Sequence, residues 1–421
     1  MTQSPAALLG TAFLAALLIS LALKLWLFWR QARHVAAHRG AVPPAFADRI
    51  SLDSHQKAAD YTRAKVRAAI LPLFAEVGLV LWLTLGGGLQ TLHEITASQL
   101  DGLHYGVVLI VLTMVLSSLI DLPFSLHRQF VIEARFGFNR MTLGLFLSDL
   151  LKQTALSAAI GVPLLYAVLW LMGDMGEGWW LYVWLLWASF NLLMLWAYPA
   201  FIAPLFNKFS PLADTALVER IEQLLARCGF RSKGLFVMDG SKRSAHGNAY
   251  FTGLGNNKRI VFFDTLIERL TPSETEAVLA HELGHFRHRH IVQRIVLMFG
   301  GALAFLWLLA QLMHADWFFA GLGVSAQNTA TALLLFAFAL PPFLFPLSPL
   351  GSLLSRRHEY QADRYAAQHA AANELVSALV KLYQDNAATL TPDPVYSSFY
   401  DSHPPAALRI RALQSLPAPA A

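Results

Sequence analysis

The chain reads TPSETEAVLAHELGHFRHRHIVQRIVLMFGGALAFLWLLAQLM over residues 271–313, and this stretch indicates the kind of structure it forms. Thr271 suits a helix N-cap, Pro272 suits the first helical position, and Glu274 completes a capping box. From about residue 291 onward the stretch is apolar over roughly the 20 residues that a helix needs to cross a bilayer. The sequence therefore predicts a polar helix joined to a membrane span, and the two can form one continuous helix.

Apolar stretches of this length recur along the chain. Hydrophobic residues make up 56% of the 421 residues and charged residues only 14%, which is too little charge for a water-soluble surface. The sequence predicts a mainly α-helical, polytopic membrane protein with seven transmembrane helices and a small cytoplasmic α/β domain. The seven predicted spans lie near residues 5–29, 68–90, 103–123, 154–173, 179–202, 291–313 and 329–352.

Lysine and arginine are unevenly distributed among the predicted loops. The segment 30–67 and the loop after the third span are basic, whereas the connections 91–102, 174–178 and 314–328 contain neither residue. Because positive loops stay on the cytoplasmic side, we expect the N-terminus outside and the C-terminus inside. We expect a multi-pass protein of a bacterial inner membrane, with the HELGH helix on the cytoplasmic side.

The net charge of +5 has the same explanation, since membrane proteins collect basic residues in their inner loops. No basic, aromatic nucleic-acid module is present, so we expect no nucleic-acid partner. The single cysteine, Cys228, excludes a disulfide within the chain. Glu76 lies inside the second predicted span, where a carboxylate is either functional or is a protonated or paired residue that faces a wet cavity.

The segment between the fifth and sixth spans reads as a small α/β unit. A helix is predicted over 214–227, with Gly229 as the residue that ends it. Short strands are predicted over 235–238, 248–252 and 260–263. The resulting division comprises four parts. They are spans one to five (1–202), the cytoplasmic insert (203–290), spans six and seven (291–352) and a cytoplasmic tail that completes the metal site (353–421).

The HELGH motif carries the predicted chemistry. His281 and His285 are four residues apart, so both imidazoles lie on one helix face and can share one metal ion. Glu282 can then reach a water on that metal as general base. The bland alternative is a solvated helix with incidental histidines. His288 and His290, in FRHRH, are better explained as a basic interfacial cap than as further ligands.

A catalytic zinc needs a third protein ligand and an open position for water. Spans six and seven form a hairpin that returns the chain to the side it left, just before Glu359 and Asp363. Glu359 is therefore the predicted third ligand. Asp363, one turn further along, is placed to orient a ligand histidine. Two imidazoles and a carboxylate suit one Zn²⁺ per chain.

Beyond HELGH, the chain resembles the integral-membrane CAAX prenyl proteases, zinc metallopeptidases related to the yeast a-factor-converting enzyme. The resemblance rests on LPFSLHRQFVIEARFGFNRMTLGLFLSDLLK (122–152), PLFNKFSPL (204–212), SAHGNAYFTGLGNNKRIVFFDTLI (244–267), SRRHEYQADRYA (355–366) and SHPPAALRIRAL (402–413). It implies a seven-helix barrel enclosing a large chamber that the protease domain closes on the cytoplasmic side.

The resemblance also implies site residues. Metal ligands carry over onto His281, His285 and Glu359, and the catalytic acid/base onto Glu282. The family position of Asp363 is sometimes called a proton donor, although geometry favours an orienting role. A substrate strand would pair with the edge at Asn248 and Ala249. His403 and Arg409 would stabilise the oxyanion, against the plain alternative of a loop histidine and a surface arginine.

Three functions compete. The first is a zinc endopeptidase acting on a peptide or protein that ends in a prenylated CAAX box. The second is a membrane-protein quality-control protease with the same chemistry. The third is a scaffold or chaperone without enzymatic activity, which an open coordination position disfavours because structural zinc sites have four protein ligands.

Overall fold

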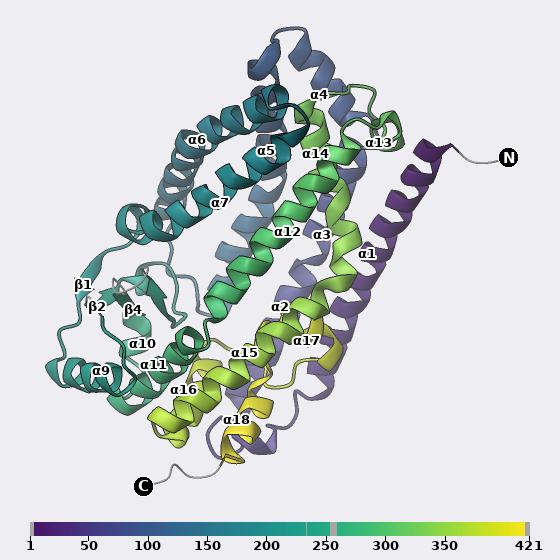
Figure 1. The fold of residues 1–421 in the computed structure, drawn as a ribbon. Helices are drawn as coiled ribbons and strands as arrows, with labels where there is room; N and C mark the ends of the chain where they lie inside the picture. The colour runs from purple at the N-terminus through teal and green to yellow at the C-terminus, as the bar shows by residue number, and fades with distance from the viewer. Residues whose placement is uncertain (1–3, 233, 253–258, 417–421) are drawn as a thin grey trace.

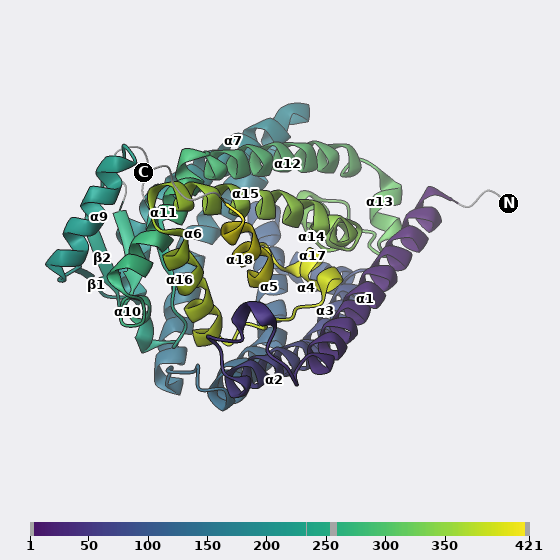
Figure 2. The ribbon, with the colours of Figure 1, turned by 90° about the horizontal axis from the view of Figure 1, so that it is seen from below.

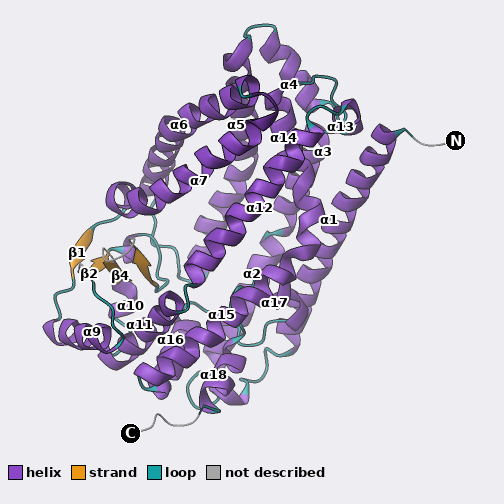
Figure 3. Cartoon of the chain, in the orientation of Figure 1, coloured by secondary structure: helices purple, strands orange, loops and turns teal. Residues whose placement is uncertain are grey.

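A computed structural model describes residues 4–232, 234–252 and 259–416 of the chain. Long helices form a bundle, and a smaller mixed α/β part lies at one end of it (Figures 1 and 3). The two chain ends lie at opposite ends of the bundle (Figure 1). Seven helical stretches of the described residues are long and apolar enough to cross a membrane, which confirms the predicted fold class.

Several of these stretches consist of more than one helix. In chain order they are α1 (Pro5–Ala37); α2 (Leu52–Ala68) with α3 (Ile70–Leu83); α5 (Gly102–His127) with the π-helical η2 (Arg128–Glu133); α6 (Leu143–Asp174); η3 (Gly176–Gly178), α7 (Trp179–Ala197), η4 (Tyr198–Ile202) and α8 (Ala203–Phe206); α12 (His290–Leu312); and α14 (Thr329–Leu344), η6 (Phe345–Leu347) and α15 (Ser348–His369). Short helices α4 (Gly88–Ala97) and α13 (Asp316–Gly321) lie on the connections at the end of the bundle far from the sheet (Figure 1).

The basic segment predicted as a loop contains a helix, α2, which follows the short η1 (Pro44–Phe46). Ser51 caps α2 by accepting a hydrogen bond from the amide of Ser54 at 3.2 Å. The helix buries Ala59, Thr62 and Val66, which are three and four residues apart, so a mostly polar segment still has one buried face.

The insert contains a four-stranded sheet of order β1-β2-β4-β3. Its strands are β1 (Phe209–Pro211), β2 (Leu235–Met238), β3 (Ala249–Thr252) and β4 (Arg259–Phe263). The pair β2–β4 is parallel and the other two pairs are antiparallel, which leaves β3 at an edge. The second to fourth strands agree with prediction within one residue, but β1 was missed because it is only three residues long and contains a proline.

The remaining helices lie beside this sheet and along the lower end of the bundle (Figure 1). They are α9 (Thr215–Arg227), α10 (Asp264–Ile267), α11 (Pro272–Arg287), α16 (Ala372–Asp385), α17 (Pro394–Tyr400) and α18 (Ala406–Gln414), with η5 (Gly240–Lys242) between strands. Seen from below, α16 and α18 lie across the end of the bundle (Figure 2). The chain thus places its last helices against the segment that carries HELGH.

The HELGH helix does not continue into the sixth span. Arg289 adopts a left-handed conformation with φ of 56°, which ends α11 and turns the chain before α12 begins at His290. Such a conformation is costly for a non-glycine residue, so nothing in the sequence signals the break. The seventh span, by contrast, runs past residue 352 without a loop, because α14, η6 and α15 form one helical stretch.

Candidate metal centre

Helix α11 presents the HELGH side chains from a well-capped start. The Thr271 amide donates to Glu274 Oε2 at 2.8 Å, and the Glu274 amide donates to Thr271 Oγ1 at 3.2 Å, as the predicted capping box requires. This cap fixes where the helix begins. His281 and His285 therefore stand one turn apart on a single face, with their Nε2 atoms 3.2 Å apart.

A glycine allows the second helix to approach. A Cβ atom on Gly284 would lie 2.8 Å from the Cα atom of Ala362 and 3.1 Å from the Cβ atom of Tyr365, both in α15. Only a residue without a side chain therefore permits the observed packing of α11 on α15. This close approach carries Glu359 to the two imidazoles.

We expect Gly284→Ala to force these helices apart and to lower zinc affinity and peptide cleavage at least about tenfold, with a stability loss of about 1–3 kcal/mol from overpacking. Zinc retention after dialysis against a chelator and thermal unfolding in detergent measure both effects. Gly300→Ala in α12 is the matched control, because its Cβ would meet no atom within 4 Å. Full zinc retention by Gly284→Ala would contradict this explanation.

The three predicted ligands meet. His281 Nε2 lies 3.4 Å from Glu359 Oε2, and His285 Nε2 lies 3.4 Å from Glu359 Oε1. One ligand atom from each residue lies within 4.8 Å of the others. Tetrahedral zinc with bonds of about 2.0–2.2 Å would separate its ligand atoms by about 3.3–3.6 Å, close to these distances.

The buried carboxylate of Glu359 supports the same assignment. Its Oε2 atom is buried and makes no hydrogen bond to any described residue. A buried charged oxygen without a hydrogen-bond donor is costly, and a bound cation would remove that cost. The donor set therefore fits a zinc ion.

Asp363 lies behind His281, as predicted. Its Oδ1 atom is 2.9 Å from His281 Nδ1, so the imidazole can donate from Nδ1 and keep its Nε2 lone pair for a metal. Arg409 of α18 holds this carboxylate with two hydrogen bonds, Nε to Oδ2 at 2.8 Å and Nη2 to Oδ1 at 2.5 Å. Its Nη1 atom also lies 3.5 Å from Glu359 Oε2. Arg409 is buried, which excludes the plain alternative of a surface arginine.

The electrostatics of α11 suit its proposed roles. Burial raises the pKa of Glu282 above the usual carboxyl value, toward that of a useful general base. Burial, together with the charge of His281, lowers the pKa of His285 to about 3, so this imidazole is neutral. Burial acts to lower the pKa of His281 as well, but the carboxylates of Asp363 and Glu359 outweigh it and raise that pKa to about 9. The site thus favours positive charge beside these carboxylates.

The remaining predicted residues lie at the rim of the site or on the sheet. His403 Nε2 lies 3.4 Å from Glu359 Oε1, and the His403 side chain is 58% exposed, so it remains open to a ligand. Ala249 begins the edge strand β3, and the carbonyl of Asn248 accepts a hydrogen bond from the Phe263 amide at 2.9 Å. The outer edge of β3 pairs with no strand among the described residues.

The group of candidate metal ligands among the described residues contains neither His288 nor His290, as predicted, but the predicted interfacial position is wrong for His290. His288 is exposed, whereas His290 is only 1% exposed and its Nδ1 atom lies 3.0 Å from His285 Nδ1. The helix break at Arg289 makes this contact possible, and the break has no sequence signal. Gln361, whose Oε1 lies 2.8 Å from His290 Nε2, was not singled out either.

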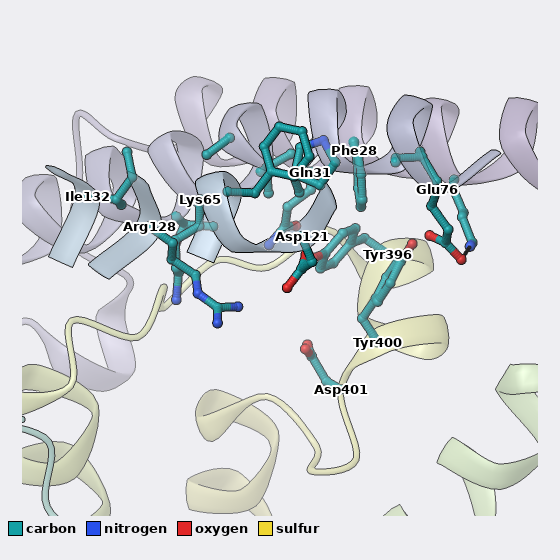
Figure 4. A pocket seen from close by; sticks show the side chains of 18 of the residues that line it. Phe28, Gln31, Lys65, Glu76, Asp121, Arg128, Ile132, Tyr396, Tyr400 and Asp401 are labelled. Carbon is teal, nitrogen blue, oxygen red and sulfur yellow. Dashed lines mark ion pairs between the residues drawn. The ribbon is translucent and has the colours of Figure 1, made fainter. Parts of the chain in front are cut away.

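A large cavity within the helix bundle extends to two residues that lie beside Glu359. Its volume is about 1300 Å³, its walls come from α1, α2, α3, α5, α14 and the tail, and its lining includes His403 and Arg409. Lys65, Asp121 and Arg128 line it as well (Figure 4). Glu76 lines the same cavity, and its Oε1 atom lies 4.0 Å from Lys24 Nζ, as the alternative of a paired carboxylate beside a cavity requires.

Comparisons with known proteins agree with this geometry. Residues 31–208 match the family described as CAAX prenyl protease N-terminal, five membrane helices, and residues 211–416 match peptidase family M48. CAAX prenyl protease 1 of Saccharomyces cerevisiae is 34% identical over 399 residues, covering 88% of each chain. The Arabidopsis thaliana CAAX prenyl protease 1 homolog is 40% identical over 308 residues, covering 71% of each chain. The crystal structure of S. mikatae Ste24p matches with a TM-score of 0.89 and 32% identity, over 98% of this chain and 100% of that one.

Proposed function

The chain belongs to the CAAX prenyl protease family of membrane-embedded M48 zinc metallopeptidases, and we propose that it removes the C-terminal tripeptide from proteins ending in a prenylated CAAX box. The observation that carries this proposal is the position of the His281, His285 and Glu359 cluster beside a cavity within the membrane helices. A lipid-modified C-terminus could enter such a cavity while its peptide bond lies at the metal centre.

We propose that His281, His285 and Glu359 bind the zinc ion. When bound, zinc supplies a Lewis acid for the scissile carbonyl and lowers the pKa of water. Glu282 accepts a proton from the attacking water and passes it to the leaving amine. Asp363 holds His281 in the tautomer that leaves its Nε2 atom free for the metal.

The oxyanion and the substrate backbone need further groups. His403 approaches Glu359 from the cavity side and can donate from Nε2 to a developing oxyanion, with the Nη1 group of Arg409 adding positive charge nearby. An extended substrate would add to the β3 edge at Asn248 and Ala249. Backbone pairing of this kind tolerates varied side chains, as a processing protease requires.

The same proposal assigns an orientation. The distribution of basic loops supports an orientation with the metal centre and the C-terminus in the cytoplasm and the N-terminus outside. Prenylated C-termini are then presented on the side where the sheet and α18 close the bundle.

We expect the purified protein to release the tripeptide from a farnesylated CAAX peptide, by cleavage after the cysteine, at least about tenfold faster than from the unmodified peptide. Mass spectrometry identifies the cleaved bond. A zinc chelator should abolish cleavage, and added zinc should restore it. Equal cleavage of an unlipidated membrane segment would favour quality control instead, and no zinc-dependent cleavage of either substrate would overturn the proposal.

A further inference from the structure

We propose that His290 and Gln361 form a hydrogen-bond relay that fixes the tautomer of His285 and presents its Nε2 lone pair to the metal. His285 Nδ1 lies 3.0 Å from His290 Nδ1, and His290 Nε2 lies 2.8 Å from Gln361 Oε1. The inference rests on the ligand role of His285 proposed above. His290 is thus a positioning residue and not a fourth ligand.

The helix break creates the first contact of this relay. On a continuous helix, residues five apart would point about 140° away from each other, so His290 could not face His285. The left-handed conformation of Arg289 ends α11 and turns the first residue of α12 back toward the HELGH face. A backbone conformation that is unfavourable for arginine therefore coincides with a contact to a ligand residue.

The direction of the protons follows from what the metal needs. A neutral imidazole that binds a cation through Nε2 carries its proton on Nδ1 and donates it. His290 must then accept at Nδ1 and donate from Nε2, and its partner must be an acceptor. Gln361 presents its amide oxygen there. With the opposite direction, His285 would carry its proton on Nε2 and could not bind the metal.

Burial and stacking hold the relay in place. His290 is 1% exposed, and its ring stacks on that of His358. The two ring centroids are 3.9 Å apart, and the angle between the ring planes is 9°. His358 in turn pairs with Gln293 and contributes no atom to the relay. The two ligand histidines thus have different partners, because His281 is oriented by a carboxylate and His285 by a neutral imidazole and amide.

The test measures zinc affinity without any substrate. We expect Gln361→Met, which removes the acceptor at similar size, to weaken zinc binding by about 10- to 100-fold in competition with a chromophoric chelator. Gln361→Glu keeps an acceptor oxygen, so its zinc affinity should stay within about threefold of wild type. Gln293→Met, the same change at an amide outside the relay, should leave the affinity unchanged.

A double variant tests whether the two residues act as one unit. We expect His290→Phe to weaken zinc binding as Gln361→Met does, and the combination to weaken it no further than His290→Phe alone. Thermal unfolding in chelator confirms that each variant is folded. Wild-type affinity in Gln361→Met, an equal loss in Gln293→Met, or additive losses in the double variant would each overturn the relay. These experiments measure zinc binding and not cleavage. The relay can therefore be correct even if the proposal of a prenylated substrate fails.

Discussion

Glu282→Gln should lower the rate of peptide cleavage by at least about 10²- to 10⁴-fold while zinc remains bound. Glutamine has nearly the same shape, but its amide cannot accept the proton of the attacking water or return one to the leaving amine. The ligand atoms come from the neighbouring residues His281 and His285 and from Glu359, so the metal centre should stay intact. Single-turnover cleavage of the farnesylated peptide and zinc content per chain measure the two quantities separately.

Glu268→Gln provides the matched control for this variant. It makes the same chemical change at an exposed residue just after α10, outside the site. It should retain wild-type cleavage. If Glu282→Gln cleaved at the wild-type rate, another group would be the base. If it lost zinc together with activity, Glu282 would be needed to build the site.

Arg409→Met should cause the largest loss of stability, about 3–5 kcal/mol, because it leaves two buried carboxylates without their shared cation. Arg409 makes both hydrogen bonds to Asp363 and lies 3.5 Å from Glu359. A bound zinc ion would supply part of the missing positive charge. We therefore expect zinc to raise the unfolding temperature of this variant more than that of wild type.

Thermal unfolding in detergent, with zinc and with chelator, measures this difference. Arg411→Met is the control, since Arg411 is exposed on the same helix. Arg409→Lys should lose less than Arg409→Met, because it keeps the charge but not the two-pronged geometry. Equal stability of Arg409→Met and Arg411→Met in chelator would show that the buried carboxylates do not depend on Arg409.

The sequence was most informative where a local pattern has one structural meaning. The capping box at Thr271 and Glu274 and the spacing of His281 and His285 each specify helix geometry within a few residues, and the structure has both. The approach of Glu359 was predictable although it lies far along the chain, because two successive spans must return the chain to its starting side. Long apolar runs likewise gave the seven spans.

Features that depend on contacts between distant elements were not predictable. Position 284 must be glycine because the backbone of α15 leaves no room for a side chain there, and no local sequence pattern reveals this contact. The break at Arg289 places an arginine where glycine is preferred, so propensity predicts a continuous helix. His290 was accordingly assigned to the surface with its neighbours, and its pairing with Gln361 could be found only from coordinates.

The distribution of the site along the chain has a consequence for the newly made protein. The imidazoles come from the middle of the sequence, whereas Arg409 lies in α18, the last described helix to leave the ribosome. Asp393, just before α17, is bound by Arg30 of the first span at 2.9 Å, so the tail docks onto a helix made long before it. We therefore expect hydrolysis to begin only after α18 has been synthesised and has folded against the metal centre.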